Sequence, residues 1–492
     1  MRRIGILTAG GDTPALNATI YGAVVRANQL RIEVVGFIKG FNSLFNPRLP
    51  HVYLNPLFQT IPELDPAKGG TLLAASRDYV DPNDRASIDG IMTRLHRLGI
   101  DGLICVGGDG TMNAMQPLAE YLPTVLAPKT IDNDLGLNDR SDPDRWRREP
   151  DAAAGGTYRL AEVDGALDIE QMVNVVTPGY ATAVYVTASG IGRVRTTAES
   201  HRRIAIVEVM GRHSGFIALG SAYGQPDIVL VPEVPIDLDR IVDRIRDLYD
   251  LQKNVVIVCG EGIVDTSGRE LGAEKSSTDP AGNTVLGGAA NVLRQMLAER
   301  LGDQYFKDLR RGSGAQEVIF TRKVGHTQRG GRPVLFDRFH ATQLGGQAVD
   351  LLAGGFSNHV AVLQWRRDRG FYVSHVDGNA FRDRWGHIHA RRVHPSFYDP
   401  VGMKPSRTGI EYLTQIFTGA IGQDDVDAVR ETLFAPGNLM TRYHSVNTDV
   451  SKRIRYLEPA AAVRSSADLT TSSNRTRPNG LTRGAALQSS TP

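Results

Sequence analysis

The sequence has few of the features that mark secreted, membrane-spanning or nucleic-acid-binding proteins. Only two cysteines, Cys105 and Cys259, occur in 492 residues, and each lies in an apolar, strand-like run. They argue against a disulfide framework or a zinc site and indicate inert core thiols in a reducing compartment. The formal net charge is only +2, so we expect neither nucleic acid nor an anionic membrane as a partner.

Long apolar runs are also missing. No segment approaches the roughly 20 apolar residues that a membrane-spanning helix needs. The N-terminal stretch MRRIGILTAGGDTP has a short apolar run that ends in glycines and an acid, so we expect a first β-strand rather than a signal peptide. These features predict a cytoplasmic protein.

What the sequence does contain is a repeated order of strand, glycine-rich turn and helix. Residues 3–8, 33–39, 102–106 and 124–130 have the pattern of strands, and helical spacing follows at 15–29 and from Gly110 to about residue 122. This order predicts an α/β fold with a parallel, doubly wound sheet. Charged residues in 136–180 look like a surface insertion rather than core.

A second α/β block starts near residue 181. Helical stretches are expected at 181–200, 237–249 and 337–352, and strands at 203–210, 228–232, 254–259, 359–365 and 370–376. We therefore predict an α/β domain at 1–180, a second at 181–355 and a C-terminal extension at 356–457 that packs on the core. Residues 458–492 are rich in Ser and Thr, and we predict a disordered tail.

Two glycine-rich turns could hold phosphate groups. Gly10–Thr13 follows the first strand, where glycines allow the backbone to approach an anion, although such glycines also serve turn geometry alone. Gly107–Thr111 has the same setting, with Asp109 placed where a metal ion on a phosphate could sit. Loops of this second kind also occur in NAD kinases and lipid kinases.

Residues 128–134, PKTIDND, give the strongest local signal. Two carboxylates and a lysine follow another strand of the same sheet. Phosphoryl transfer to an alcohol needs a carboxylate that accepts the hydroxyl proton and cations that stabilise the developing charge. An Asx-type turn is the alternative interpretation.

Taken together, these motifs resemble those of the phosphofructokinase family, and the resemblance runs from residue 3 to about residue 355. The patterns that carry the resemblance occur in the family's order: GGD at 10–12, GT to SR at 70–77, GGDGT at 107–111, PKTIDND at 128–134, SHRR at 200–203, MGR at 210–212, PE at 232–233, GEG at 260–262 and GHTQRGG at 325–331. The resemblance implies two Rossmann-like doubly wound domains of the phosphofructokinase fold. It also implies 6-phosphofructokinase activity in glycolysis.

The resemblance further implies a role for each matching residue. Asp132 is expected to be the catalytic base, with Thr130, Asp134 and Lys129 beside it. Asp109 is expected to hold Mg²⁺. The donor phosphates would meet Gly11, Arg77, Gly108, Asp109, Gly110 and Thr111, and Arg77 and Arg203 would stabilise the transferring phosphoryl group. Fructose 6-phosphate would be held by Thr130, Asp132, Asp134, Arg203, Met210, Gly211, Arg212, Glu233, His326 and Arg329.

In the family some of these arginines come from a neighbouring subunit, so the resemblance implies a homo-oligomer, either a dimer or a tetramer. Taken alone, His326 and Arg329 are typical surface groups, and only the GHTQRGG pattern favours a binding role. The sequence departs from the family pattern at Ala15 and at Phe320, where glycine and arginine are usual.

Two positions give opposite indications about the phosphoryl donor. Gly110 resembles the ATP-dependent members, because a carboxylate there would crowd and repel a nucleotide's α-phosphate. Lys129 resembles the pyrophosphate-dependent members. We favour ATP, with pyrophosphate as the alternative.

Two other functions match parts of the sequence. An NAD or lipid kinase shares the GGDGT loop but leaves MGR and GHTQRGG without a role. A non-catalytic regulatory subunit is suggested by Ala15 and Phe320, but the retained Asp109, Asp132 and Asp134 argue against it.

Overall fold

The computed structural model describes residues 1–148, 158–161, 165–278, 284–309 and 314–458. Residues Met1–Leu457 form one compact unit, and the fold of this unit is described below. The tail predicted at 458–492 lies, apart from Glu458, outside the described residues. No helix in the described part of the chain is both long enough and apolar enough to cross a bilayer.

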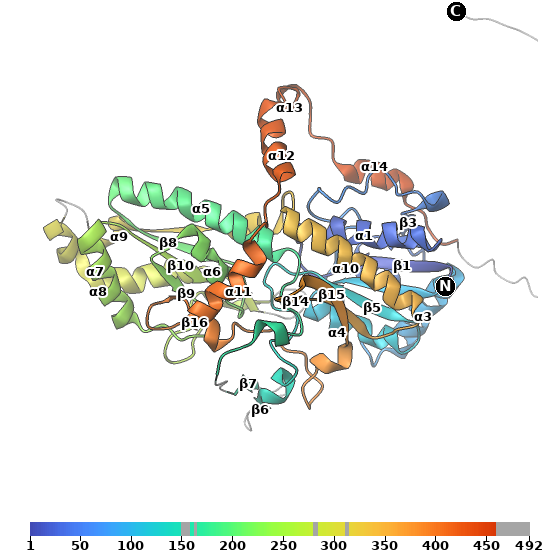
Figure 1. The fold of residues 1–492 in the computed structure, drawn as a ribbon, viewed down its shortest axis with the longest axis horizontal. Helices are drawn as coiled ribbons and strands as arrows, with labels where there is room; N and C mark the ends of the chain where they lie inside the picture. The colour runs from blue at the N-terminus through green and yellow to red at the C-terminus, as the bar shows by residue number, and fades with distance from the viewer. Residues whose placement is uncertain (149–157, 162–164, 279–283, 310–313, 459–492) are drawn as a thin grey trace, which may run out of the picture. The chain divides into compact units, whose positions relative to one another are not determined.

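The first sheet has seven strands with a parallel centre (Figure 1). Its spatial order is β15 (Gly370–Asp377), β14 (His359–Arg366), β5 (Thr124–Pro128), β4 (Gly102–Gly107), β1 (Arg3–Thr8), β2 (Glu33–Phe37) and β3 (His51–Tyr53). The strands from β14 to β2 are parallel, and β15 and β3 pair antiparallel at the edges. The segment after residue 355 therefore adds two strands to the first sheet.

Strand β4 shows why this sheet is covered on both faces. Leu103 and Cys105 pack in a core with α3 (Arg85–Arg97) and α4 (Asp109–Ala119), whereas Ile104 and Val106 pack in a core with α1 (Leu16–Gln29) and α10 (Leu335–Ala353). Alternate side chains point to opposite faces of a strand, and a continuous apolar run is typical of a parallel strand buried on both faces. Cys105 is a buried free thiol, and burial raises its pKa.

The second sheet has four parallel strands in the order β13 (Ile319–Lys323), β8 (Ile204–Val209), β10 (Val255–Gly260) and β9 (Ile228–Leu230). One face packs against α5 (Tyr180–His201) and α6 (Phe216–Gly220), and the other packs against α7 (Leu238–Gln252) and α8 (Ala289–Leu309). Cys259 is buried in β10. Two parallel sheets with helices on both faces confirm the predicted α/β class and the doubly wound arrangement.

Shorter elements complete the unit. They are α2 (Gly40–Phe45), η1 (Pro56–Phe58), η2 (Asp142–Arg145), β6 (Trp146–Arg148), β7 (Tyr158–Leu160), η3 (Ile169–Gln171), η4 (Ser221–Gly224), β11 (Ala273–Thr278), β12 (Thr284–Leu286), α9 (Ala315–Val318), η5 (Gly325–Arg329), η6 (Gly378–Phe381), η7 (Pro395–Phe397), β16 (Tyr398–Asp399), β17 (Lys404–Pro405), α11 (Arg407–Phe417), α12 (Gln423–Phe434), α13 (Gly437–Met440) and α14 (Val446–Arg453).

The prediction of a surface insertion at 136–180 is wrong for its C-terminal part. Val175, Val176 and Tyr180 are fully buried in the core that contains α5. The Val175 N–H donates to the Leu363 carbonyl at 2.8 Å, and the Asn174 side chain accepts from the Leu363 N–H at 3.0 Å, so this segment runs beside β14. The charged residues at 139–151 dominate the composition and hide the apolar run at 172–176 that follows them. Residues 149–157 and 162–164 lie outside the described residues.

Helices α1 and α10 approach each other closely at glycine. A Cβ atom on Gly22 would lie 1.9 Å from the Thr342 carbonyl oxygen, and one on Gly345 would lie 2.0 Å from the Thr19 carbonyl oxygen. The two helices therefore pack backbone against backbone at these glycines.

We predict that Gly22→Ala destabilises the protein by about 1–3 kcal/mol, because the backbone of α10 must move away from the new methyl group. Gly346→Ala is the matched control: its Cβ would meet nothing closer than 3.7 Å, so helix propensity should leave stability unchanged or raised by up to about 1 kcal/mol. Urea unfolding of both variants measures the difference. Equal stabilities would contradict the close packing.

Candidate active site

Three loops of the first sheet meet at one edge. Because β1, β4 and β5 are parallel, their carboxyl ends lie side by side, which is where ligands bind in such sheets. Together the loops contribute to a single cavity the residues Gly10, Gly11, Thr13, Gly108, Asp109, Gly110, Thr111, Lys129, Thr130, Asp132 and Asp134. The structure thus brings together the three motifs that the sequence singled out.

The opposite wall of this cavity comes from other parts of the chain. Gly211 and Arg212 follow β8, and Arg329 ends η5. Ile388 and Ala390 come from the segment after residue 355. Arg77 and its neighbours in the 76–79 stretch close a further side. The cavity holds about 700 Å³, enough for a small phosphorylated ligand.

Asp132 lies inside the cavity with one oxygen unsatisfied. The side chain is buried, and its Oδ1 has no hydrogen-bond partner among the described residues. Its Oδ2 lies 3.8 Å from Nη2 of Arg329. Burial raises the pKa of Asp132, an effect that the charge of Arg329 opposes. A desolvated carboxylate with a free acceptor is suited to accept a proton from a substrate.

Hydrogen bonds fix the loop around Asp132. The Thr130 hydroxyl donates to Oδ1 of Asp134 at 2.9 Å and accepts from the Asp132 N–H at 3.1 Å. Burial raises the pKa of Asp134 to about 6, and the nearby charge of Asp132 adds to this rise. Two carboxylates this close cannot both ionise at their ordinary pKa.

Asp109 stands at the start of α4, where it is partly exposed to the cavity. Its Oδ1 accepts from the Gly110 N–H at 2.7 Å. Surrounding protein atoms still desolvate the carboxylate and raise its pKa to about 6, and the charge of Asp134 contributes. A divalent cation near Asp109 would offset this repulsion.

The structure shows no group of three metal-ligating side chains in its described ranges. Mg²⁺ commonly binds through one or two carboxylates together with substrate phosphates and water. Asp109 therefore fits a magnesium ion that arrives with a phosphate ligand, but not a dedicated protein cage.

Lys129 is a buried cation in the same cavity. Its Nζ donates to the carbonyl oxygen of Gly11. Burial and the nearby charge of Arg329 lower its pKa to about 8, although Asp12 and Asp132 oppose the shift. The ammonium is therefore fixed against the first glycine-rich turn.

Four predicted substrate-binding residues do not line this cavity. Arg203 precedes β8, whereas the cavity lies at the other end of that strand, so a single chain does not bring Arg203 to Asp132. His326 is exposed on η5. Met210 is partly buried, and its N–H donates to the Gln328 side chain at 3.0 Å.

Glu233 is the fourth. Its Oε1 accepts from the N–H groups of Gly215 and Val393, both at 2.8 Å, and its Oε2 is buried with no partner among the described residues. In this structure Glu233 therefore serves the backbone around it. The sequence pattern identified its position but gave no indication of the Val393 contact.

Several lining residues were not predicted. Tyr79 and Asn113 lie next to predicted motifs and could have been included by extending them. Ile388 and Ala390 carry no functional side chain and match no motif, so no sequence signal points to them.

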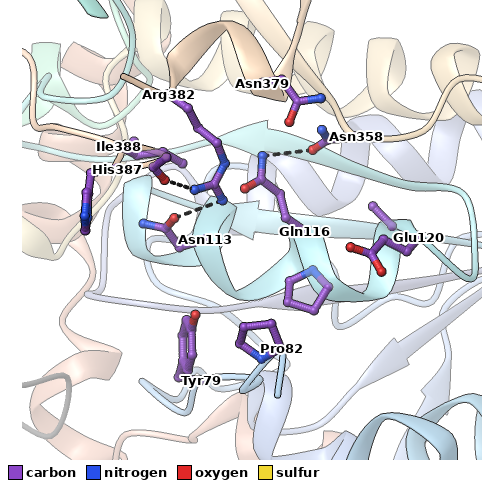
Figure 2. Close-up of a pocket in the computed structure, with 13 residues that line it drawn as sticks. Tyr79, Pro82, Asn113, Gln116, Glu120, Asn358, Asn379, Arg382, His387 and Ile388 are labelled. Atoms are coloured by element: carbon purple, nitrogen blue, oxygen red, sulfur yellow. Dashed lines mark hydrogen bonds between the residues drawn. The ribbon is translucent and has the colours of Figure 1, made fainter. Parts of the chain in front are cut away.

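A second cavity of about 690 Å³ adjoins the first (Figure 2). Both cavities are lined by Tyr79, Asn113 and Ile388. Figure 2 shows the side chains of Asn113 and Gln116 on α4 facing Arg382 and Asn358 of the C-terminal segment. Arg382 donates to Asn113 at 3.4 Å, and Gln116 donates to Asn358 at 3.1 Å.

Comparisons with known proteins agree with this geometry. The sequence pattern of the Phosphofructokinase family matches residues 3–141 and 160–352. The chain is 32% identical over 365 residues to the pyrophosphate–fructose 6-phosphate 1-phosphotransferase of Amycolatopsis methanolica. The aligned region covers 73% of this chain and 90% of that protein. It is 34% identical over 368 residues to ATP-dependent 6-phosphofructokinase 3 of Streptomyces coelicolor, and this aligned region covers 74% of this chain and 91% of that protein.

Solved structures show the same fold. The pyrophosphate-dependent phosphofructokinase from Marinobacter aquaeolei aligns with a TM-score of 0.62 at 16% identity, covering 86% of this chain and 92% of that one. The phosphofructokinase of Saccharomyces cerevisiae aligns with a TM-score of 0.52 at 20% identity, covering 77% of this chain and 45% of that one. The chain belongs to the phosphofructokinase family and is a phosphotransferase with an alcohol group as acceptor.

Proposed function

We propose that this protein is an ATP-dependent 6-phosphofructokinase that phosphorylates the 1-hydroxyl of fructose 6-phosphate to give fructose 1,6-bisphosphate in glycolysis. The observation that carries the proposal is the unsatisfied Oδ1 of Asp132, buried beside Arg329 in a cavity lined by two glycine-rich turns. Asp132 accepts the proton of the 1-hydroxyl as that oxygen attacks the γ-phosphorus of ATP, while the bond from this phosphorus to the β,γ-bridging oxygen breaks and ADP leaves.

The other groups act on charge and position. Arg77, Lys129 and Gly11 meet the donor phosphates, together with the N-terminal turn of α4 at Gly108–Thr111. When Mg²⁺ is bound through Asp109, it neutralises charge on the donor phosphates. Arg329, Arg212 and Gly211 hold the sugar phosphate, while Thr130 keeps Asp134 in place.

Arg203, His326, Met210 and Glu233 complete the proposed sugar site only in an oligomer or after movement of the loops. Arg203 lies at the far end of β8 from the cavity, so we assign it to the site of a neighbouring subunit in a homodimer or homotetramer. The proposal takes 1–180 and 181–355 as the two α/β domains and 356–457 as an extension on the core, with the exchange that α10, β14 and β15 pack in the layers of the first sheet. It also places the enzyme in the cytoplasm, which the two buried free thiols support.

Two features support ATP as the donor. A Cβ atom on Gly110 would meet nothing within 4 Å, so this side of the phosphate site is open. The adjoining cavity beside α4 offers hydrogen-bonding groups from Asn113, Gln116 and Arg382 (Figure 2). The nucleoside part of ATP fits this space, whereas pyrophosphate has no nucleoside to place in it.

Pyrophosphate remains the second candidate donor because of Lys129. Its ammonium lies within the phosphate-binding part of the cavity, where it would compensate a compact, highly charged donor. Relatives at similar identity carry names of both donor types.

The acceptor is tested by a product assay with purified protein, Mg²⁺ and ATP. We expect one ADP released for each fructose 1,6-bisphosphate formed, and no phosphorylation of NAD or diacylglycerol. Phosphorylation of NAD or lipid without turnover of fructose 6-phosphate would overturn the proposal.

We predict an acid limit of activity near pH 6. The pKa values of Asp109 and Asp134 are raised to about 6, and that of Asp132 is raised as well. The surrounding charges are Arg329 on η5, Arg212 after β8, Lys129 and Glu261. Because the active forms are ionised, kcat/KM should fall as the pH drops through about 6. A pH–rate profile measures this limit, and a limit near 4, the ordinary value for aspartate, would contradict the buried site.

A further inference from the structure

The C-terminal segment contains an arginine buried against the loop that carries Asp132. Arg391 is 4% exposed. Its guanidinium donates to backbone carbonyls rather than to a carboxylate in the described part of the chain. The residue lies outside the ranges that match the family pattern, which end at residue 352.

The main acceptor of this guanidinium is the carbonyl oxygen of Asn133, between Asp132 and Asp134. Nε donates to it at 3.0 Å and Nη2 at 2.7 Å. The Arg391 N–H also donates to the carbonyl oxygen of Asp134 at 2.6 Å. Three hydrogen bonds from one residue therefore hold two successive peptide groups of the catalytic loop.

The loop needs such support because Asn133 has a positive φ of 55°. This left-handed conformation is unfavourable for residues with a side chain, although asparagine tolerates it better than most. The Asn133 side chain is also fixed, since its Nδ2 donates to the Tyr412 hydroxyl at 2.8 Å and its Oδ1 accepts from the Thr177 N–H at 2.9 Å.

The same arginine is anchored to other parts of the core. Its guanidinium donates to the Asn174 carbonyl and lies 4.7 Å from the centre of the Phe216 ring. Its carbonyl oxygen accepts from the Ser214 hydroxyl at 2.7 Å. Ser214 follows the MGR motif, so Arg391 connects the Asp132 loop of the first sheet with the loop after β8 of the second.

We propose that Arg391 is a positioning residue, which holds the Asp132 loop in its reactive geometry through hydrogen bonds to the Asn133 and Asp134 carbonyls. This inference rests on the proposed role of Asp132 as the base. The guanidinium fork holds the Asn133 and Asn174 carbonyls at fixed angles, whereas a lysine keeps the charge but not the fork. The bond to the Asp134 carbonyl comes from the backbone N–H of residue 391 and stays in either case. Displacement of a reacting group by about 1 Å can lower a rate by about 100-fold.

The test is a double-mutant cycle with Arg391→Lys and Asp132→Asn, in which kcat, KM and unfolding temperature are measured for all four proteins. We expect Arg391→Lys to lower kcat about 10- to 100-fold, with a change in the KM for fructose 6-phosphate of less than about threefold. In the Asp132→Asn background, Arg391→Lys should lower the remaining kcat by less than about twofold, because the base through which it acts is gone.

Arg294→Lys is the matched control. Arg294 also donates to backbone carbonyls, of Ile319 at 2.7 Å and of Gln316 at 2.5 Å, and none of these residues lines the cavity. Its kcat should stay within about twofold of wild type. If Arg391→Lys lowers kcat equally in both backgrounds, or changes only stability, the positioning role is refuted.

If Arg391→Lys does not fold, Tyr412→Phe tests the support of the same loop through the Asn133 side chain. This variant removes the hydroxyl that accepts from Asn133 and donates to the Val175 carbonyl, both at 2.8 Å, and it should lower kcat about two- to tenfold in wild type and not in Asp132→Asn. Additive losses would overturn the proposal. If Asp132→Asn itself remains fully active, the proposed base is wrong. If only Arg391→Lys remains fully active, the positioning role of Arg391 is wrong and the proposed base stands.

Discussion

Asp132→Asn lowers kcat by about 10²- to 10⁴-fold, the range in which a general base contributes to catalysis. Asparagine has nearly the same shape as aspartate but cannot accept the proton of the sugar hydroxyl. The KM for fructose 6-phosphate should change much less, because Arg329 and Arg212 remain in the cavity.

Stability separates this effect from misfolding. Asp132 is a buried carboxylate whose Oδ1 has no partner, so a neutral side chain removes a desolvation penalty and should not lower the unfolding temperature. Steady-state kinetics and thermal unfolding measure the two quantities on the same protein. Asp84→Asn is a control: Asp84 caps α3 by accepting from the Ser87 N–H at 3.1 Å, and asparagine caps equally well. An Asp132→Asn enzyme with wild-type kcat would remove Asp132 from the mechanism.

Gly110→Asp should lower kcat/KM for ATP by about 10²- to 10³-fold. The new carboxylate would stand beside the α-phosphate, and two like charges about 4 Å apart repel by roughly 4 kcal/mol at an effective dielectric constant near 20. The protein itself should accept the change, because a Cβ atom at Gly110 meets nothing within 4 Å.

The matched control is Gly190→Asp on α5, where a Cβ atom also meets nothing within 4 Å and which does not line the cavity. This variant should retain wild-type kcat/KM for ATP. Kinetics with varied ATP at saturating fructose 6-phosphate measure the effect. Unchanged use of ATP by Gly110→Asp would show that no nucleotide phosphate lies beside residue 110.

The sequence was sufficient to predict the parallel sheets and the loops at their carboxyl ends. The alternation of glycine-rich turns with apolar strands is a local property, and parallel strands bring their carboxyl ends together whatever the side chains elsewhere. Strand geometry therefore predicts that the loops carrying Asp109 and Asp132 lie at one edge of the sheet, whereas the roles of Asp109, Lys129 and Asp132 follow from the resemblance to the family.

The contribution of the segment after residue 355 could not be predicted in the same way. Arg391 belongs to a stretch without regular secondary structure, and its partners are backbone carbonyls rather than acidic side chains. Every residue has a backbone carbonyl, so the residue types nearby do not show which carbonyls an arginine will bind. From sequence, such a buried arginine therefore cannot be told from an exposed one.

The burial of 172–180 was missed for a related reason. The Asn174 side chain accepts from the Leu363 N–H and donates to the Leu135 carbonyl, and these contacts join positions far apart in the chain. A window of neighbouring residues therefore suggests a polar insertion, whereas the tertiary contacts make it core.

Parallel measurement of kcat/KM with ATP and with pyrophosphate, on the unmodified enzyme with Mg²⁺ and fructose 6-phosphate, tests the central claim most directly. We predict that fructose 1,6-bisphosphate forms with ATP and that kcat/KM for pyrophosphate is at least 100-fold lower. Formation of fructose 1,6-bisphosphate with pyrophosphate but not with ATP would contradict the account.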